Sequence, residues 1–482
     1  MESASFASNP VFNAAAPALR GPLLSNNASR QNNVEPQGGI VYFLAVAYAF
    51  VLYSRLHEVA TVMAGRNMYL FTIVLVPTLA AVLLSGKVVR PLLTRVGILF
   101  LLFTFWAMAG IPFSAWPGGS YAVFRQAWLV SLFTFVVIAG VADSIRRCRQ
   151  FADIIAWALL LDVVTIARYA AYVNGRLTMD FGMLSNPNDM ANHYVIGLPF
   201  CVLIALDAPG WYSAKRWFGL VLSFVVIFQS LRSGSRAGII TLCAMFIVSF
   251  LLVTKANKAK LLLGTALLVL IGIALLPRVV LIRYQLLLSS ADEVGVESSE
   301  EALEAQHAVG SSKGRKFLLE QSIRLAMQHS ILGTGIGVFQ VAYNKLAQEQ
   351  GIRGKDSWRE SHNTYTQLAA EMGIPGFLFY MSAVLWCFRK CLWLHRRARQ
   401  CNNSAIGNLA FALVLSLVGF IVGGCFINIP YTFYFSILAG LTVASAAAAE
   451  PMLGAAPAPA TANYSNPLQG SGWAAARQLV RR

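Results

Sequence analysis

The chain has 482 residues, of which 57% are hydrophobic and 12% are charged, and its formal net charge is +17. A soluble domain carries about 25% charged residues, so this composition excludes an ordinary soluble protein. Nucleic-acid binding is excluded as the reason for the basic charge, because the Lys and Arg residues lie in short connectors between apolar runs rather than on one polar domain.

Polar tails flank the apolar part of the chain. Residues 1–38 are rich in Ser, Asn and Ala, and they lack the basic start and short apolar core of a signal peptide. Residues 450–482 are rich in Ala, Pro and Gly. Both compositions are typical of disordered segments.

Apolar runs recur from residue 39 to residue 449, and each is long enough to cross a hydrocarbon core of roughly 30 Å as a helix. Because a helix satisfies its own backbone polar groups in lipid, the sequence predicts an all-α, polytopic membrane bundle. The short alternating strands that a membrane barrel would need are not seen. About twelve transmembrane helices are predicted, at residues 39–54, 68–85, 97–114, 121–141, 151–173, 188–206, 217–231, 237–254, 261–276, 364–388, 405–425 and 430–449.

Basic residues alternate between successive connectors. One set of connectors (86–96, 142–150, 207–216, 255–260 and 389–404) carries 16 Lys and Arg residues, and the alternate short connectors carry 5. The positive-inside rule therefore places the first set and both termini in the cytoplasm. The long loop 277–361 lies on the outer face, between helices 1–9 (39–276) and helices 10–12 (362–449).

A polar turn, residues 231–238, joins the seventh and eighth predicted spans at the outer face. Arg232 and Arg236 would share one helix face if a helix began there. Guanidinium groups bind phosphate oxygens bidentately and stay charged at physiological pH, which makes both arginines candidate ligands. The alternative is that they extend to lipid headgroups.

The long outer loop contains a predicted amphipathic helix at residues 314–329, which ends near Gly333. Arg315 at its start is the stronger candidate ligand of this loop, and Arg283 is a weaker one. The Gly-Thr-Gly-Ile-Gly segment at 333–337 follows no predicted strand, so we interpret it as a close-packing turn rather than a nucleotide loop.

A second polar motif lies where the outer loop re-enters the membrane. An unperturbed imidazole titrates near 6.5, so His362 can accept a proton from a hydroxyl group near neutral pH; alternatively it caps a helix. Asn363 and Tyr365 flank it as candidate substrate ligands. Glu371 follows inside the span, one turn before a kink expected at Pro375. A carboxylate within a span is a functional candidate, although Glu371 could instead pair with an arginine.

Other candidates lie inside the bundle. Asp162 is near the middle of a span, where it would serve a transporter as a proton relay or a folded bundle as a hydrogen-bonding group. Arg125 lies near an outer helix end and is a candidate ligand. The seven cysteines avoid the long outer loop, so no disulfide framework is expected. We predict no metal site and no cofactor.

Several of these motifs, taken in order, resemble the superfamily of O-antigen ligases and Wzy-type O-antigen polymerases. They are Ser-Gly-Ser-Arg-Ala-Gly at 233–238, Gly-Arg at 314–315, Gly-Thr-Gly-Ile-Gly at 333–337, His-Asn-Thr-Tyr at 362–365 and Glu-Met-Gly-Ile-Pro-Gly at 371–376. The resemblance covers roughly residues 40–450. It implies a bacterial inner-membrane enzyme whose essential residues correspond to Arg236, Arg315 and His362.

The resemblance also implies a metal-independent glycosyltransferase that takes a glycan from undecaprenyl pyrophosphate at the periplasmic face. A ligase moves the glycan to lipid A–core, and a polymerase moves it to another repeat unit of a growing polysaccharide. A transporter of lipid-linked glycans is the alternative from another class, and a scaffold for envelope proteins is a third. A transporter needs basic residues along a path through the bundle, whereas here the candidates gather at the predicted outer rim.

Overall fold

The structure, a computed structural model, describes residues 39–285 and 299–454. The chain divides into Met1–Ile40 and Val41–Arg482, and the second unit contains nearly all that is described. The tails predicted to be disordered lie outside the described residues, except that the last helix continues to Gly454.

Nine helices of the described residues are long and apolar enough to cross a membrane. The helices α1 (Gly39–Tyr53) and α2 (Leu56–Ala64) are bent by 69° and make a tenth crossing if they form one span. Two apolar helices, α3 (Leu70–Leu84) and α11 (Arg236–Leu252), are shorter. The nine are α5 with η2 (Arg95–Phe113), α6 to α7 (Pro117–Val141), α8 (Ile145–Tyr169), α9 (Pro187–Leu206), α10 (Ala214–Arg232), α12 (Lys255–Leu275), α16 (Thr364–Gln400), α17 (Ser404–Gly423) and α18 (Phe433–Gly454).

Every predicted span overlaps one of these helices, so the all-α, multi-pass membrane bundle is confirmed, although α3 and α11 are shorter than the helices that qualify as spans. The boundaries differ where a helix continues into a polar connector. α16 runs to Gln400, through the predicted connector 389–404, and α12 begins at Lys255. A helix continues past the membrane boundary when its next residues are good helix formers, which Lys and Arg are.

The helices begin where the sequence offers a capping side chain. Thr94 precedes α5 and accepts the amide hydrogen of Gly97, and Ser144 precedes α8 and accepts that of Arg147. Asn403 does the same for α17. Each cap satisfies an amide group that the first helical turn leaves without a partner.

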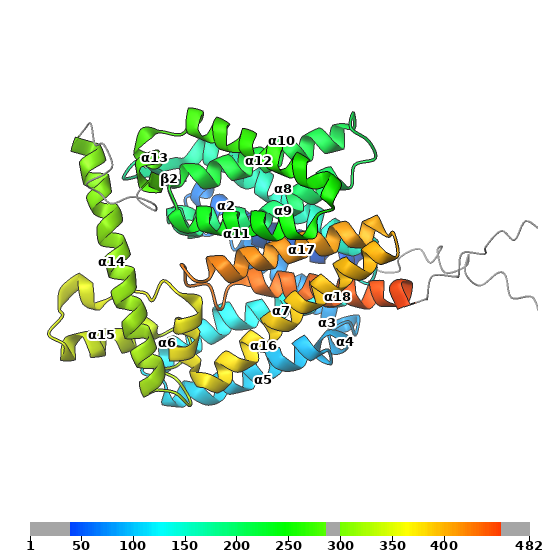
Figure 1. Cartoon of the computed structure of the whole chain (residues 1–482). Helices are drawn as coiled ribbons and strands as arrows, with labels where there is room; N and C mark the ends of the chain where they lie inside the picture. Colours follow the sequence, from blue (N-terminus) through cyan, green and yellow to red (C-terminus); the bar gives the residue numbers. More distant parts are fainter. Residues whose placement is uncertain (1–38, 286–298, 455–482) are drawn as a thin grey trace, which may run out of the picture. The chain divides into compact units, whose positions relative to one another are not determined.

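The centre of the bundle is formed by α9, which packs against α8, α10, α11 and α17, and by α16, which packs against α5, α17 and α18 (Figure 1). The apolar stretch of α9 is 83% buried, whereas that of α12 is 6% buried. A helix that is apolar on all sides and buried belongs to the core, and one that is apolar but exposed faces lipid. α12 is therefore a peripheral helix.

One end of the bundle collects the basic connectors, and we call it the basic end. Asp143 pairs with Arg147 at 2.6 Å and with Lys87 at 3.8 Å, which joins connectors 86–96 and 142–150. Arg149 pairs with Asp207, and Arg399 donates to the carbonyl of Leu252 at 2.7 Å. These contacts link segments that the charge pattern assigns to one side of the membrane.

The other end of the bundle carries the polar elements α13 (Arg278–Gln285), α14 (Ser299–Gln328), α15 (Phe339–Glu349) and η6 (Gly354–Ser357), and we call it the α14 end (Figure 1). α14 begins earlier than the predicted helix 314–329 and ends as predicted. Its buried residues Leu318, Ser322 and Leu325 recur at the spacing of one helix face, as expected for an amphipathic helix.

A β-hairpin at this end was not predicted. The predicted span 151–173 is wrong at its end, because α8 stops at Tyr169 and the chain forms β1 (Ala170–Val173) and β2 (Arg176–Met179), paired antiparallel. Asn174 and Gly175 between the strands have φ values of 51° and 69°. Two residues with positive φ form the hairpin turn that Asn-Gly favours, and this turn ends the helix.

The helix α16 is broken at Gly373, where φ is 63°. The break leaves carbonyl groups without helical partners, and residues 330–335 supply amides to them: Thr334 donates to the Ala370 carbonyl at 2.8 Å and Gly335 to the Glu371 carbonyl at 2.9 Å. Trp106 of α5 donates to the Met372 carbonyl at 2.9 Å. The expected kink thus lies at Gly373, two residues before Pro375, and it is the docking point of the loop between α14 and α15.

Candidate active site

Four arginines from four different elements meet at the α14 end. Arg176 lies on β2, Arg236 is the first residue of α11, Arg283 lies on α13 and Arg315 lies on α14. The positive charges of Arg236 and Arg315 act on both Arg176 and Arg283, and that of Arg236 acts on Arg315. The four guanidinium groups are therefore near neighbours, and we call them the arginine cluster.

The turn between α10 and α11 holds two members of the cluster through its backbone. Arg176 Nε donates to the carbonyl of Ser233 at 2.8 Å, and Arg283 Nε donates to that of Gly234 at 3.2 Å. Gly234 has a φ of 60°, and a Cβ there would lie 3.2 Å from Arg176 Cγ and 3.3 Å from Arg283 Cδ. Glycine is favoured by this backbone conformation, and a larger residue would also press on the two arginine side chains.

The cluster is suited to an anion. Burial, with a smaller contribution from neighbouring arginines, lowers the pKa of Arg176 to about 10 and that of Arg283 to about 9. Both side chains remain protonated at neutral pH, so a bound anion would relieve the repulsion between them. Guanidinium groups match phosphate oxygens in geometry, and the N-terminus of α11, which begins in the cluster, adds partial positive charge.

The N-terminus of α9 completes one side of this site. Asn188 Oδ1 accepts from Arg176 at 3.0 Å and from the Ser235 hydroxyl at 3.1 Å, so it fixes β2 and the start of α11 together. The negative charge of Asp189 acts on Arg315 and raises its pKa, against the larger lowering effect of burial. Asp189 is half-buried and therefore accessible to a polar ligand.

His362 is within electrostatic range of the arginine cluster, since the positive charge of Arg315 acts on its imidazole. Its backbone has a φ of 51°, in the left-handed region that costs a residue with a side chain about 1–3 kcal/mol. The next residue, Asn363, is held by its side chain. Asn363 Nδ2 donates to the carbonyl of Cys425 at 3.1 Å, and Asn363 Oδ1 caps α16 by accepting from Tyr365 N and Thr366 N. These contacts hold the conformation of His362.

The surroundings of His362 favour its neutral form. Burial is the largest cause that lowers its pKa below 6.5, and the positive charges of Arg315 and Arg359 lower it further. The carboxylate of Glu360 acts in the opposite direction. A neutral imidazole at physiological pH has a free lone pair on one ring nitrogen and can accept a proton.

Of the other arginines predicted at the site, one joins the arginine cluster and two do not. Arg283 belongs to the cluster, whereas Arg232 ends α10 and donates to the hydroxyl of Tyr172 on β1, with its guanidinium carbon 5.8 Å from the centre of that ring. Arg232 and Arg236 lie on two helices separated by the Ser-Gly turn and do not share a helix face. Arg125 is exposed on the π-helical turn between α6 and α7, and it acts on none of the four arginines or His362 in the described structure.

Tyr365 and Glu371 have structural partners. The Tyr365 hydroxyl donates to the carbonyl of Ile421 at 2.5 Å. Glu371 is fully buried and accepts from Gly337 N at 3.0 Å, Phe339 N at 2.9 Å, the Tyr431 hydroxyl at 2.6 Å and Gln367 Nε2 at 3.1 Å. A carboxylate with this many donors fixes the glycine-rich loop against α16. The arginine partner that the sequence allowed as an alternative is not among these donors, which are two backbone amides and two neutral side chains.

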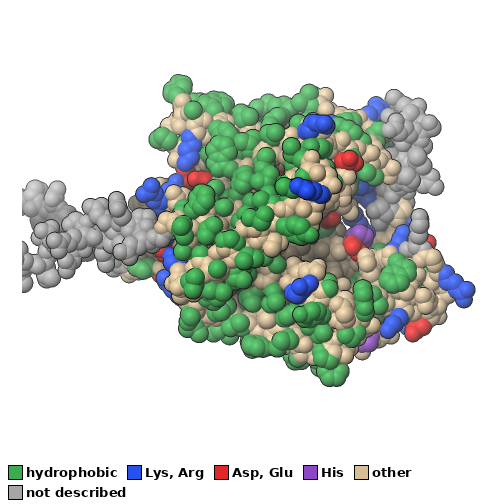
Figure 2. Space-filling view, turned by 180° about the vertical axis from the view of Figure 1, so that it is seen from behind, with side chains coloured by type: hydrophobic (Ala, Val, Ile, Leu, Met, Phe, Trp, Pro, Cys, Tyr) green, Lys and Arg blue, Asp and Glu red, His purple; other side chains and the backbone are tan. Residues whose placement is uncertain are grey.

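Sequence reasoning missed Arg176, Asn188 and Asp189. The signals that would have found them are the Asn-Gly hairpin turn, which directs Arg176 back toward the bundle, and the polar segment at residues 186–189, which opens an otherwise apolar span. Figure 2 shows a recess in the surface, beside residues drawn in grey, where acidic, basic and histidine side chains gather.

A family model described as O-antigen ligase matches residues 218–381, about a third of the chain. Residues 218–381 are therefore similar to an O-antigen ligase domain. This domain holds Arg236, Arg283, Arg315 and His362, and the superfamily resemblance is thereby confirmed. Arg176 and Asn188 reach the same site from outside the domain. The chain has no significant match among curated proteins.

Proposed function

We propose that this protein is an O-antigen ligase-like glycosyltransferase that moves a glycan from undecaprenyl pyrophosphate to a hydroxyl group of lipid A–core at the periplasmic face of the inner membrane. One observation carries the proposal: the positive charge of Arg315 acts both on the imidazole of His362 and on the guanidinium groups of Arg176 and Arg283. A proton acceptor therefore adjoins a site for a phosphorylated leaving group.

The arginine cluster would bind the pyrophosphate of the donor. During transfer, the bond between the anomeric carbon and the pyrophosphate oxygen breaks, and the bonding electrons stay on that oxygen. Negative charge on the leaving group therefore grows in the transition state. Guanidinium groups already fixed by Ser233, Gly234 and Asn188 stabilise this charge without reorganisation, which is the condition under which such stabilisation is large.

His362 would act as the general base. The hydroxyl oxygen of the acceptor attacks the anomeric carbon while the imidazole takes the hydroxyl proton. The new carbon–oxygen bond forms on the face opposite the leaving pyrophosphate, so a single displacement inverts the anomeric centre. The products are the glycosylated acceptor, undecaprenyl pyrophosphate and a protonated His362, which later releases its proton to solvent.

The placement of the site supports a position outside the membrane on the side opposite the basic connectors. The ion pairs of Asp143 and of Arg149 gather those connectors at the basic end, whereas His362 and the cluster lie among α13, α14 and β2 at the α14 end. With the basic end in the cytoplasm, the α14 end faces the periplasm.

The test is glycan transfer by purified protein in membranes supplied with a defined lipid-linked donor and lipid A–core. We expect His362→Ala to slow transfer by about 10²–10⁴-fold, the usual contribution of a general base, and Arg236→Ala to abolish detectable transfer. Arg232→Ala is the matched control, since Arg232 lies in the same turn but interacts with Tyr172. Equal transfer by wild type and both active-site variants would overturn the proposal.

The products decide between the related activities. Addition of glycan to lipid A–core identifies a ligase. Lengthening of the donor glycan without lipid A–core identifies a Wzy-type polymerase, and relocation of an unchanged donor identifies a transporter. Either of the last two results would replace the proposed activity.

A further inference from the structure

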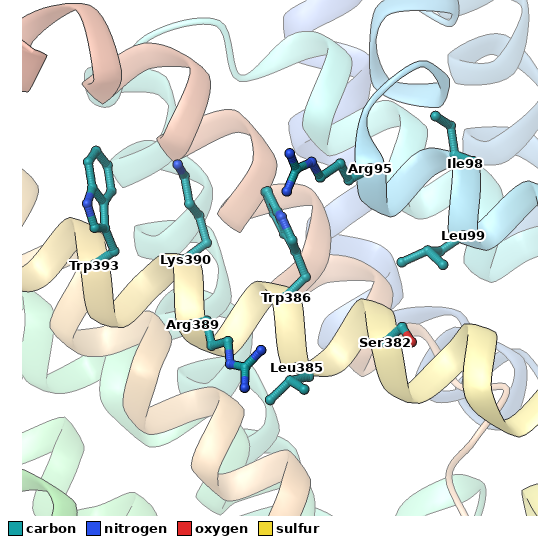
Figure 3. Close-up of a pocket in the computed structure, with 9 residues that line it drawn as sticks. All are labelled: Arg95, Ile98, Leu99, Ser382, Leu385, Trp386, Arg389, Lys390 and Trp393. Atoms are coloured by element: carbon teal, nitrogen blue, oxygen red, sulfur yellow. The ribbon is translucent and has the colours of Figure 1, made fainter.

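A cavity of about 610 Å³ lies between α5 and α16, far along both helices from His362 (Figure 3). Nine described residues line it: Arg95, Ile98, Leu99, Ser382, Leu385, Trp386, Arg389, Lys390 and Trp393. Three of them are basic and none of the nine is acidic. Figure 3 shows Arg95 and Lys390 on either side of Trp386.

The cavity is polar at one end and apolar at the other. α5 and α16 run antiparallel, because Trp106 of α5 contacts Met372 of α16 whereas Arg95 shares the cavity with Arg389. Arg95 begins α5 at the basic end, and Leu99 lies one turn, roughly 6 Å, deeper into the bundle. On α16, Leu385 lies deeper than Arg389. Charged groups therefore lie at one level and aliphatic groups below them.

The aliphatic side chains of the cavity are open to the surroundings of the protein. Ile98 is 46% exposed and Leu385 is 47% exposed, and in a membrane such surface is in contact with lipid chains. Trp393, 43% exposed, lies at the level of the basic residues, and Lys390 Nζ is 4.2 Å from the centre of its ring. Tryptophan at the level of the headgroups is typical of the boundary between lipid and water.

Two positive charges in the cavity are available to a ligand. The guanidinium groups of Arg95 and Arg389 have no hydrogen bond or ion pair with any residue that the structure describes. Lys390 pairs with Glu450, so its charge is already balanced. A guanidinium group at the membrane boundary prefers a phosphate, to which it can donate two hydrogen bonds.

We propose that this cavity is a binding site for an anionic phospholipid. The headgroup phosphate lies at the level of Arg95 and Arg389, and one acyl chain follows Ile98, Leu99 and Leu385 toward the middle of the membrane. The anionic class is favoured over a zwitterionic one, because an ammonium group in the headgroup would meet the same positive charges and be repelled. Basic pockets between transmembrane helices at the cytoplasmic level are suited to such lipids.

The test is lipid binding by the full-length protein in detergent, measured by native mass spectrometry. Phosphatidylglycerol and phosphatidylethanolamine with the same acyl chains are supplied in equal amounts. We expect wild type to prefer phosphatidylglycerol, and Arg95→Gln/Arg389→Gln to bind it roughly 30-fold more weakly, since each basic side chain near a membrane surface contributes about a factor of five.

Two further variants make the result specific. Arg90→Gln/Arg396→Gln removes two exposed basic residues near the same membrane level that do not line the cavity, and it should bind like wild type. Arg95→Lys/Arg389→Lys keeps the charges and should keep the preference, which also shows that substitution at these positions is compatible with folding.

Three outcomes would overturn the proposal. They are unchanged phosphatidylglycerol binding by the Arg95→Gln/Arg389→Gln variant, equal binding of the two lipids by wild type, and complete displacement of the lipid by inorganic phosphate alone, which would make free phosphate the ligand. None of these outcomes affects the proposed glycan transfer, which takes place among other residues at the α14 end.

Discussion

The backbone of His362 is fixed from both sides in a conformation that a side chain normally avoids. Ser361 before it donates to the carbonyl of Asn363 at 3.1 Å, and Thr364 after it donates its amide to the carbonyl of Gly424 at 2.8 Å. Such local strain persists when surrounding contacts over-determine it, and it is concentrated at functional sites. The direction of the imidazole is therefore set by the main chain and by the connector between α17 and α18.

The charges around His362 predict how its activity depends on pH. The proposed general base must be unprotonated to act, so the acidic limb of the rate profile should follow the pKa of His362. Glu360 raises that pKa, while burial, Arg315 and Arg359 lower it. Removing the negative charge in Glu360→Gln lowers the pKa further, and the acidic limb of kcat/KM should move to lower pH. Because Glu360 is exposed and solvent screens its charge, we expect this shift to be small.

The measurement is kcat/KM for glycan transfer across the acidic pH range at low and high salt. Glu349→Gln is the control, because Glu349 is an exposed carboxylate of α15 that does not act on His362. A limb that stays in place at low salt, or moves to higher pH, would show that a group other than His362 controls the reaction. The shift should shrink at high salt, since salt screens an exposed charge.

At the scale of single elements, the broken helix α16 and the loop that docks on it form one unit. The amide of Ile374 donates to the carbonyl of Ser330 at 2.8 Å, in addition to the contacts at Ala370 and Glu371. Glu371 then accepts from the amides of Gly337 and Phe339. The loop between α14 and α15 is thus held by both the backbone and a side chain of α16, which fixes one end of the helix that carries Arg315.

Gly373 is the position at which this unit is most sensitive. Its φ is 63°, and a Cβ there would lie 1.9 Å from the carbonyl oxygen of Ile331. Gly373→Ala therefore requires the loop to leave α16, and we expect a loss of stability of about 2–4 kcal/mol, in the range of mutations that break buried backbone contacts. Gly264→Ala is the matched control, since Gly264 lies within α12 and has no atom within 4 Å of its added Cβ.

Thermal unfolding of the two purified variants in the same detergent provides the comparison. Gly264→Ala should unfold at the wild-type temperature or slightly above it, because alanine favours the helix. Gly373→Ala should unfold at a clearly lower temperature. Equal unfolding temperatures for the two variants would mean that the break in α16 does not hold the loop.

The sequence predicts an element well when many residues determine that element, and poorly when one or two residues do. Apolar length determines a membrane helix, and therefore each of the twelve predicted segments overlaps an apolar helix, nine or ten of which are long enough to span a membrane. The hairpin that carries Arg176 depends on only two residues, Asn174 and Gly175. The residues before them are apolar enough to read as the end of the membrane span predicted at 151–173. The polar turn at residues 231–238 was recognised, yet the separation of Arg232 from Arg236 depends on where α10 ends and α11 begins, which helix propensity does not fix.

At the scale of the whole molecule, a buried polar network ties together helices that are distant in sequence. His193 of α9 contacts Asp162 of α8 at 3.0 Å through Nε2 and the Tyr434 hydroxyl of α18 at 2.9 Å through Nδ1. The Tyr53 hydroxyl of α1 donates to the carbonyl of His193 at 3.2 Å. The side chains of His193 and Asp162 are fully buried. The hydrogen-bonding role that the sequence allowed for Asp162 is thus the one that the structure shows.

This network predicts opposite effects of single and double substitution. His193→Leu leaves Asp162 buried without its partner and should destabilise the protein by about 3–5 kcal/mol. Asp162→Leu/His193→Leu removes both members, and because a buried pair is often replaceable by apolar residues, most of the stability should return. Unfolding temperatures of wild type, single and double variants in one detergent measure this. A double variant no more stable than the single one would contradict the pairing.

The contacts among the basic connectors and the position of α14 describe two distinct ends of the molecule, but the side of the membrane that each faces follows from charge alone. A native pair of cysteines makes the orientation measurable. Cys425 is exposed in the connector between α17 and α18, close to Asn363, and Cys401 lies in the connector between α16 and α17 at the other end of the same helix α17.

Because one transmembrane helix separates these two thiols, they must face opposite sides of the membrane. The experiment uses two variants, one that retains only Cys425 and one that retains only Cys401. With the basic end in the cytoplasm, a membrane-impermeant maleimide should modify the Cys425 variant in intact spheroplasts. It should modify the Cys401 variant only after the membrane is permeabilised. The reverse pattern would place His362 and the arginine cluster in the cytoplasm, where the proposed transfer to lipid A–core could not take place. Modification of both thiols in sealed spheroplasts would instead show that α17 does not span the membrane.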